Sequence, residues 1–228
     1  MSEKMFELDG RRVRLYGAES PAILFLQPVD ERDALLLEPQ LEAMERCPVP
    51  FALAAFEVKD WKRDLSPWKA PPVFGKIPFG GGAEETLRFV TDRLMAELPS
   101  RLALKEETGL CLGGYSLAGL FSLWASSRTA LFTGVAAASP SVWFPGWIDY
   151  VKEHPIQATT VYLSLGEREE RTKNPVMASV GACIREQYAL LRERCIVTLE
   201  WNPGNHFQDS GKRTARAFCW TADPERKS

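Results

Sequence analysis

The serine at position 116 is the residue whose surroundings indicate chemistry most clearly. It lies in the segment Gly113–Leu120, which reads GGYSLAGL. An apolar run precedes this segment and an apolar stretch of helical length follows it, so we expect a strand, a sharp turn at the serine and then a helix. Small residues on both sides allow such a turn to close without steric crowding. A serine hydroxyl presented in this way could attack a carbonyl carbon.

The same octapeptide also has a purely structural explanation. Turns from strand to helix use glycine for positive φ and serine for capping the first helical N–H groups. In addition, Ala118 stands where the pattern Gly-x-Ser-x-Gly has its second glycine. The extra methyl weakens the match without excluding it. Other residues of the chain are needed to distinguish a catalytic serine from a purely structural turn.

A serine nucleophile needs a base within hydrogen-bond reach, and the base needs an acid that orients it. The chain has two histidines, His154 before a proline in a polar stretch and His206 in the segment 202–207. A solitary loop histidine is also an ordinary surface residue. Three carboxylates, those of Glu167, Glu169 and Glu170, follow an apolar run that ends at residue 165. Arginines are interspersed among them, so most of this run is expected to be a solvated charge cluster.

The bulk properties of the chain exclude several classes of protein. With 228 residues, 45% hydrophobic content and a net charge of −2, residues 1–228 suit a single globular domain. The mixed charges argue against nucleic-acid binding, and no apolar run is long enough for a membrane span. The first ten residues lack the apolar core of a secretory signal. Five widely spaced cysteines without metal-ligand spacing suggest buried free thiols, a cytoplasmic location and no metal or cofactor.

Strand-like and helix-like segments alternate along the chain. Strands are expected at 22–27, 51–58, 109–112, 134–138, 160–165 and 195–201, and helices at 84–98, 117–124 and 178–192. This alternation predicts an α/β fold with a mostly parallel sheet and helices on both faces. The last strand alternates polar and apolar residues, which suits an edge of the sheet. The helix after Ser116 is apolar nearly all round and should be buried.

The segment 59–82 is rich in proline and glycine and shows no periodicity, so we expect a long functional loop. Aromatic residues on it and after the strand 134–138 could line an acyl or aryl pocket or pack the loops against the body. We select Trp61, Trp68 and Trp143 as pocket residues, from a set that also holds Phe74, Phe144 and Trp147. The three glycines at 80–82 lack the ending of a phosphate-binding loop and are expected to form a hinge.

Four segments of the chain resemble the α/β-hydrolase superfamily. The resemblance is closer to its esterase branch, which includes enterochelin-esterase-like proteins and formylglutathione hydrolases. The segments occur in the family's order and cover the C-terminal half: Gly114–Gly119, Ser139–Trp143, Gly166–Glu169 and Gly204–Phe207. The N-terminal half is similar only in layout. There, Gln27 and Pro28 stand where many relatives carry His-Gly.

The resemblance implies a three-layer α/β-hydrolase fold without a sizeable cap domain, because no long insertion follows the strand 134–138. Its order of nucleophile, acid and base selects His206, and its Gly-x-x-acid loop selects Glu169, with Glu170 second and Glu167 third. The oxyanion hole would use the backbone N–H of Leu117 and, because Pro28 has none, that of Val29.

The activity implied is hydrolysis of a small-molecule carboxylic ester through an acyl-serine intermediate, without a cofactor. Two other functions share these residues. An inactive binding module could use the same fold, since a fold does not fix a function. An acyltransferase would use the same serine, histidine and glutamate and differ only in the acceptor. The sequence leaves the natural ester and the oligomeric state open.

Overall fold

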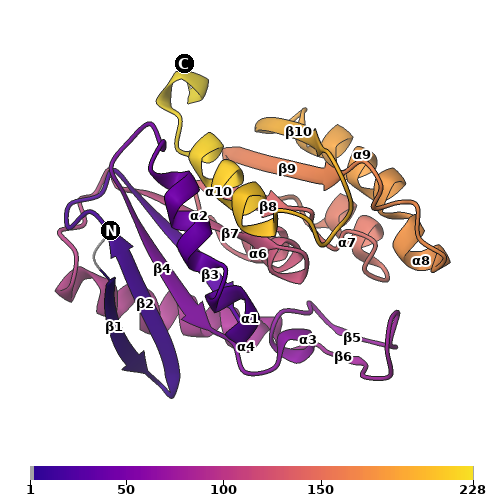
Figure 1. Ribbon diagram of the computed structural model, residues 1–228, viewed down its shortest axis with the longest axis horizontal. Helices are drawn as coiled ribbons and strands as arrows, with labels where there is room; N and C mark the ends of the chain where they lie inside the picture. Colours follow the sequence, from indigo (N-terminus) through magenta and orange to yellow (C-terminus); the bar gives the residue numbers. More distant parts are fainter. Residues whose placement is uncertain (1–2, 228) are drawn as a thin grey trace.

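A computed structural model describes residues 3–227 of the chain. Its main element is an eight-stranded sheet with the order β1-β2-β4-β3-β7-β8-β9-β10 (Figure 1). β1 and β2 join it antiparallel, and the six strands from β4 to β10 run parallel. The strands span β1 (Glu3–Leu8), β2 (Arg11–Gly17), β3 (Ile23–Val29), β4 (Phe51–Glu57), β7 (Gly109–Tyr115), β8 (Gly134–Ala138), β9 (Thr160–Gly166) and β10 (Ile196–Asn202). The predicted mostly parallel sheet is therefore confirmed.

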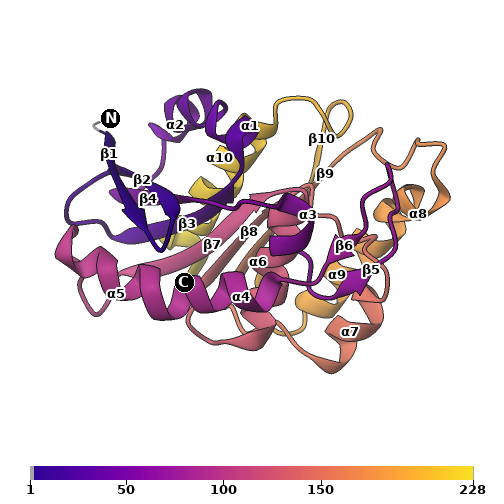
Figure 2. The ribbon, with the colours of Figure 1, turned by 90° about the horizontal axis from the view of Figure 1, so that it is seen from below.

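Helices cover both faces of this sheet (Figure 2). α1 (Glu31–Ala34), α2 (Leu37–Met44) and α10 (Ser210–Thr221) lie on one side. The other side carries α4 (Ala83–Arg88), α5 (Met95–Glu97), α6 (Leu117–Arg128), α7 (Trp147–Glu153) and α9 (Val180–Leu191). The short helices α3 (Trp61–Asp64) and α8 (Pro175–Ala178) complete the set.

The layers follow from strands that are apolar on both faces. All seven residues of β3 are buried. Phe25 points to the layer of α10, where its ring lies 4.6 Å from that of Phe218. Its neighbours Leu24 and Leu26 pack into the opposite layer, which contains α6. Successive side chains of a strand alternate between faces, so a continuous apolar run requires cover on both sides. β10 has mostly half-exposed residues and lies at the edge, as expected.

The helix predicted over 84–98 is broken into several pieces. α4 passes into a π-helical segment, Phe89–Leu94, then α5 and a final 3₁₀ turn, Leu98–Ser100, which contains Pro99. Elements absent from the sequence prediction include the β1–β2 hairpin, α1, α2, α7, α8 and α10. Of these, α10 matters most for the site because it packs against β7, β8 and β9.

The segment 59–82, expected to be a long functional loop, contains regular secondary structure. It folds into α3 and a small antiparallel pair, β5 (Lys69–Ala70) and β6 (Phe79–Gly80). The hinge predicted at 80–82 is wrong, because these glycines are tightly packed. A Cβ on Gly80 would lie 2.7 Å from the Arg63 side chain, and one on Gly81, where φ is +73°, would lie 2.7 Å from the backbone of Lys69.

Between residues 3 and 227, no helix is both long and apolar enough to cross a lipid bilayer. All five cysteines are free thiols. Cys111 is buried, whereas the other four are half-buried, so the expectation of buried thiols holds for one of them only.

Candidate active site

The turn between β7 and α6 holds Ser116 in an unusual backbone conformation. β7 ends at Tyr115, α6 begins at Leu117, and Ser116 between them has φ +58° and ψ −118°. Positive φ is costly for a serine and persists only where the surrounding structure imposes it. The predicted strand, sharp turn and helix are therefore present.

Gly114 makes room for the alanine that interrupts the expected glycine pattern. A Cβ placed on Gly114 would lie 2.6 Å from the Cβ of Ala118. Real Cβ atoms do not approach so closely, so only one of these two positions can carry a methyl group. The departure at Ala118 is thus accommodated by the glycine on the other side of the turn. Gly119 allows a further close approach, since a Cβ there would lie 3.1 Å from the Pro140 side chain.

This pairing predicts a specific stability effect. Gly114→Ala should destabilise the protein by about 1–3 kcal/mol, the range for overpacking a filled core site. Adding Ala118→Gly should restore most of the loss, because it removes the methyl group that collides. Urea unfolding of the two single variants and the double variant measures this. Equal losses from Gly114→Ala with and without Ala118→Gly would show that the two positions do not compete for space.

The Ser116 hydroxyl is not used to cap the helix. α6 has no side-chain hydrogen bond at its N-cap, which removes the structural explanation for the serine. Its Oγ lies 3.0 Å from Nε2 of His206 and 3.2 Å from Oγ of Ser141. Residues ninety positions apart in the sequence thus meet at the carboxyl ends of the parallel strands.

His206 is held from its other ring nitrogen. Its Nδ1 lies 2.6 Å from Oε2 of Glu169, whose side chain is 5% exposed. A carboxylate can only accept a hydrogen bond, so Nδ1 carries the proton and Nε2 presents a lone pair to the serine. Glu169 reaches this place from the turn that follows β9, and His206 from the loop that follows β10. Parallel neighbours bring both turns to the same edge of the sheet.

The second carboxylate oxygen of Glu169 is fixed by three donors. Oε1 accepts from the backbone N–H of Gly166 at 2.7 Å, from Oγ of Ser139 at 2.8 Å and from Nη1 of Arg213 at 3.3 Å. Oε1 is therefore the anchored oxygen and Oε2 the one that faces the imidazole. Glu170 instead pairs with Arg185 at 3.4 Å. Glu167 is exposed.

Four residues near Ser116, His206 and Glu169 were not identified from the sequence: Tyr115, Ser139, Ser141 and Arg213. Tyr115 donates a hydrogen bond from Oη to the backbone carbonyl of His206 at 2.8 Å. Burial, followed by the nearby Glu169 carboxylate, raises the pKa of Tyr115 to about 12, so Oη keeps the proton that it donates. Ser139 has φ +42°, the second strained serine of the site. The segment 139–143 was noted as a motif, and its two serines were the available signal.

The residues expected to form an oxyanion hole lie at or just beyond the carboxyl ends of the adjacent strands β3 and β7. Leu117 is the first residue of α6, where backbone N–H groups have no partner within the helix. Val29 is the last residue of β3, and its carbonyl accepts from the N–H of Val58 at 2.9 Å. Beside it, the buried side chains of Gln27 and Gln40 form two mutual hydrogen bonds, of 2.7 and 3.2 Å. The departure from His-Gly thus replaces an imidazole with an amide pair that ties β3 to α2.

The tryptophans expected at the pocket are packed between segments. Trp68 donates from Nε1 to the carbonyl of Pro145 at 3.0 Å, and its ring contacts Phe144 and Tyr150. Trp143 is 9% exposed and packs against the rings of Phe74 and Phe79. Trp61 is half-buried against the same core. These contacts join the segment 59–82 to the body, and a role of the three tryptophans in substrate contact stays a prediction.

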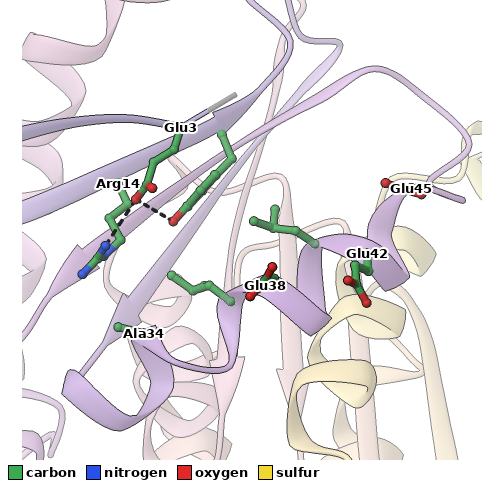
Figure 3. Close-up of a pocket in the computed structure, with 9 residues that line it drawn as sticks. Glu3, Arg14, Ala34, Glu38, Glu42 and Glu45 are labelled. Carbon is green, nitrogen blue, oxygen red and sulfur yellow. Dashed lines mark hydrogen bonds and ion pairs between the residues drawn. The ribbon is translucent and has the colours of Figure 1, made fainter. Parts of the chain in front are cut away.

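The most voluminous of the cavities described lies away from Ser116, His206 and Glu169. It measures about 580 Å³ and is bounded by β1, β2 and α2 (Figure 3). Four glutamates line it, and one of them, Glu3, accepts from Arg14 at 3.2 Å and from Tyr16 at 2.9 Å. None of its lining residues belongs to the Ser116–His206–Glu169 group. The chemistry of the side chains, and not the size of a hollow, therefore locates the candidate active site.

Comparison with known proteins gives matches in structure only. No protein-family model matches the chain, and no curated protein sequence matches it. Among solved structures, the siderophore hydrolase EstA from Aspergillus nidulans is 18% identical, with 97% of this chain and 93% of that chain covered and a TM-score of 0.69. An IroE-like serine hydrolase from Shewanella oneidensis is 17% identical, with coverages of 96% and 79% and a TM-score of 0.75.

A third similar structure is the enterobactin esterase FES from Shigella flexneri, at 15% identity and a TM-score of 0.60. This chain is matched over 96% of its length but spans only 59% of that protein. At such identities the likeness concerns the fold. The chain has the α/β-hydrolase fold that the motifs around Ser116, Glu169 and His206 indicated, in the form seen in siderophore hydrolases.

Proposed function

We propose that this protein is a serine hydrolase of carboxylic esters, with Ser116 as nucleophile, His206 as general base and acid, and Glu169 as the orienting acid. One observation carries the proposal. A continuous line of hydrogen bonds runs from Ser116 Oγ to His206 Nε2 at 3.0 Å and from His206 Nδ1 to Glu169 Oε2 at 2.6 Å. This is the geometry that makes a serine hydroxyl nucleophilic near neutral pH.

The reaction follows from these contacts. Ser116 Oγ attacks the acyl carbon while its proton passes to His206 Nε2, and we propose that the N–H groups of Leu117 and Val29 stabilise the resulting oxyanion. His206 then protonates the departing alcohol, which leaves the acyl group on Ser116. A water molecule then attacks the acyl-enzyme and gives its proton to His206. His206 returns this proton to Ser116 Oγ as the carboxylic acid product leaves. Glu169 stays ionised and stabilises the imidazolium at both stages.

Ser141 is proposed to hold the nucleophile in place before attack. Its hydroxyl lies 3.2 Å from Ser116 Oγ, and the residue is buried. Ser116 can donate to His206 while it accepts from Ser141. Ser141→Ala should therefore lower kcat by roughly 5-fold, the equivalent of one ordinary hydrogen bond of about 1 kcal/mol. Steady-state hydrolysis of an activated ester measures this. An unchanged kcat would show that Ser141 does not position the serine.

The substrate class is suggested by the similar structures. Two of them are described as a siderophore hydrolase and an enterobactin esterase. We therefore propose ester-linked siderophores as the first natural substrates to test. The His206 side chain is 25% exposed and Phe207 beside it is 88% exposed, so the imidazole can be reached from solvent.

The proposal is tested by turnover of a panel of esters that varies the acyl chain and the leaving group and includes a siderophore lactone. We expect hydrolysis of activated esters by the wild type and none by a variant without the Ser116 hydroxyl. Added alcohols or thiols distinguish an acyltransferase, since these would then capture the acyl group in preference to water. Absence of turnover across the panel, with the protein folded, would favour the binding module instead.

A further inference from the structure

A buried arginine on α10 lies behind the triad. The Arg213 side chain is 3% exposed, and its guanidinium donates to three different segments of the chain. Nη1 donates to Tyr115 Oη at 3.1 Å and to Glu169 Oε1 at 3.3 Å, and Nη2 donates to the carbonyl of Pro203 at 2.8 Å. A guanidinium this deeply buried is stable only when it is paired and hydrogen-bonded.

The three partners of Arg213 stand beside or within the triad. Tyr115 directly precedes Ser116, Glu169 is the proposed acid itself, and Pro203 lies three residues before His206. Tyr115 also donates onward to the backbone carbonyl of His206 at 2.8 Å. One planar cation therefore connects the end of β7, the turn after β9 and the loop after β10.

A glutamate in this role needs more positioning than a shorter acid would. Its side chain has one more rotatable bond than aspartate, and each free torsion costs entropy to fix. Arg213, together with Ser139 and the N–H of Gly166, occupies Oε1 and leaves Oε2 for the imidazole. A positive charge near the acid does not by itself favour an imidazolium, so the benefit of Arg213 has to come from geometry and not from charge.

We propose that Arg213 is a positioning residue, which holds Glu169, Tyr115 and the loop before His206 in the arrangement that the reaction needs. The inference rests on the proposed hydrolase function. It predicts that the planar fork matters more than the charge, because lysine offers a single point of donation in place of the guanidinium's separated N–H groups.

The test measures kcat per active site in Arg213→Met and Arg213→Lys, with sites counted by complete reaction with a fluorophosphonate. We expect Arg213→Met to lower kcat per counted site by about 10- to 100-fold, as for a misplaced catalytic group, with KM changed by less than about 2-fold. Arg213→Lys should retain only slightly more kcat per counted site than Arg213→Met. The matched control is Arg216→Met on the same helix, since Arg216 is exposed and pairs with Glu200. The kcat per counted site of Arg216→Met should stay near that of the wild type.

A double-mutant cycle separates positioning from general stabilisation. If Arg213 acts through Glu169, Arg213→Met in a Glu169→Gln background should lower kcat per counted site by less than about 3-fold, because the effects of coupled residues are not additive. A purely structural role predicts fewer countable sites and a lower unfolding midpoint with kcat per site unchanged, and that result would overturn the inference. Full additivity with Glu169→Gln would overturn it too.

Failure of the proposed function gives a different pattern. A folded wild type that neither hydrolyses esters nor reacts with the fluorophosphonate removes both proposals. A wild type that does both, beside an Arg213→Lys variant with full kcat per site, removes only the inference about the planar fork of Arg213.

Discussion

Replacing Ser116 with alanine should lower ester turnover by about 10⁶-fold, the loss expected when the nucleophile of a working triad is removed. His206 and Glu169 keep their places in this variant, but no acyl-enzyme can form. Steady-state kinetics on an activated ester, with unfolding followed by circular dichroism, gives both activity and fold.

Ser100→Ala is the matched control for this loss. Ser100 is exposed, and its hydroxyl donates to the nearby carbonyl of Glu97, so its removal should leave turnover within about 2-fold of the wild type, as for most surface changes. Turnover that persists in Ser116→Ala would mean that the hydrolysis arises from another group.

Glu169→Gln should lower kcat by about 10⁴-fold, the effect of placing histidine in the wrong tautomer. The structure gives the reason. Gly166, Ser139 and Arg213 all donate to the Oε1 position, so the glutamine oxygen will occupy it. The amide NH₂ then faces His206 Nδ1, which has to become an acceptor. Nε2 consequently carries the proton and can no longer take one from Ser116.

Glu170→Gln is the natural control for this prediction. Glu170 is the next residue and pairs with Arg185 near the surface. Within residues 3–227, the carboxylate that contacts the His206 imidazole is that of Glu169 and not that of Glu170. We expect its kcat to stay within about 2-fold of the wild type. Loss of activity from Glu170→Gln with none from Glu169→Gln would assign the acid to the neighbouring residue.

The sequence was most informative where chemistry and local geometry coincide. Ser116 could be identified because a sharp turn needs small neighbours, and His206 because the chain offers one histidine at the expected place in the strand order. The parallel strands could be identified from continuous apolar runs, whereas their order in the sheet is known only from the structure. The structure brings Ser116 within hydrogen-bond distance of His206, and His206 within hydrogen-bond distance of Glu169.

Residues whose role depends on tertiary contacts could not be found in this way. Arg213 lies in a helix, where a charged side chain normally indicates a solvated face, yet its partners come from three distant segments and bury it. The same limit applies to the segment 59–82. Its order comes from contacts such as that between Trp68 and Pro145, which no local pattern reveals.

The most direct test of the account is to identify by mass spectrometry the residue that a fluorophosphonate modifies in the folded wild type. We predict one adduct per chain, on the peptide that contains Ser116, and no adduct after prior unfolding, because the reactivity depends on His206 lying 3.0 Å from the hydroxyl. An adduct on another residue, or folded protein that remains unmodified, would contradict the assignment of Ser116 as an activated nucleophile.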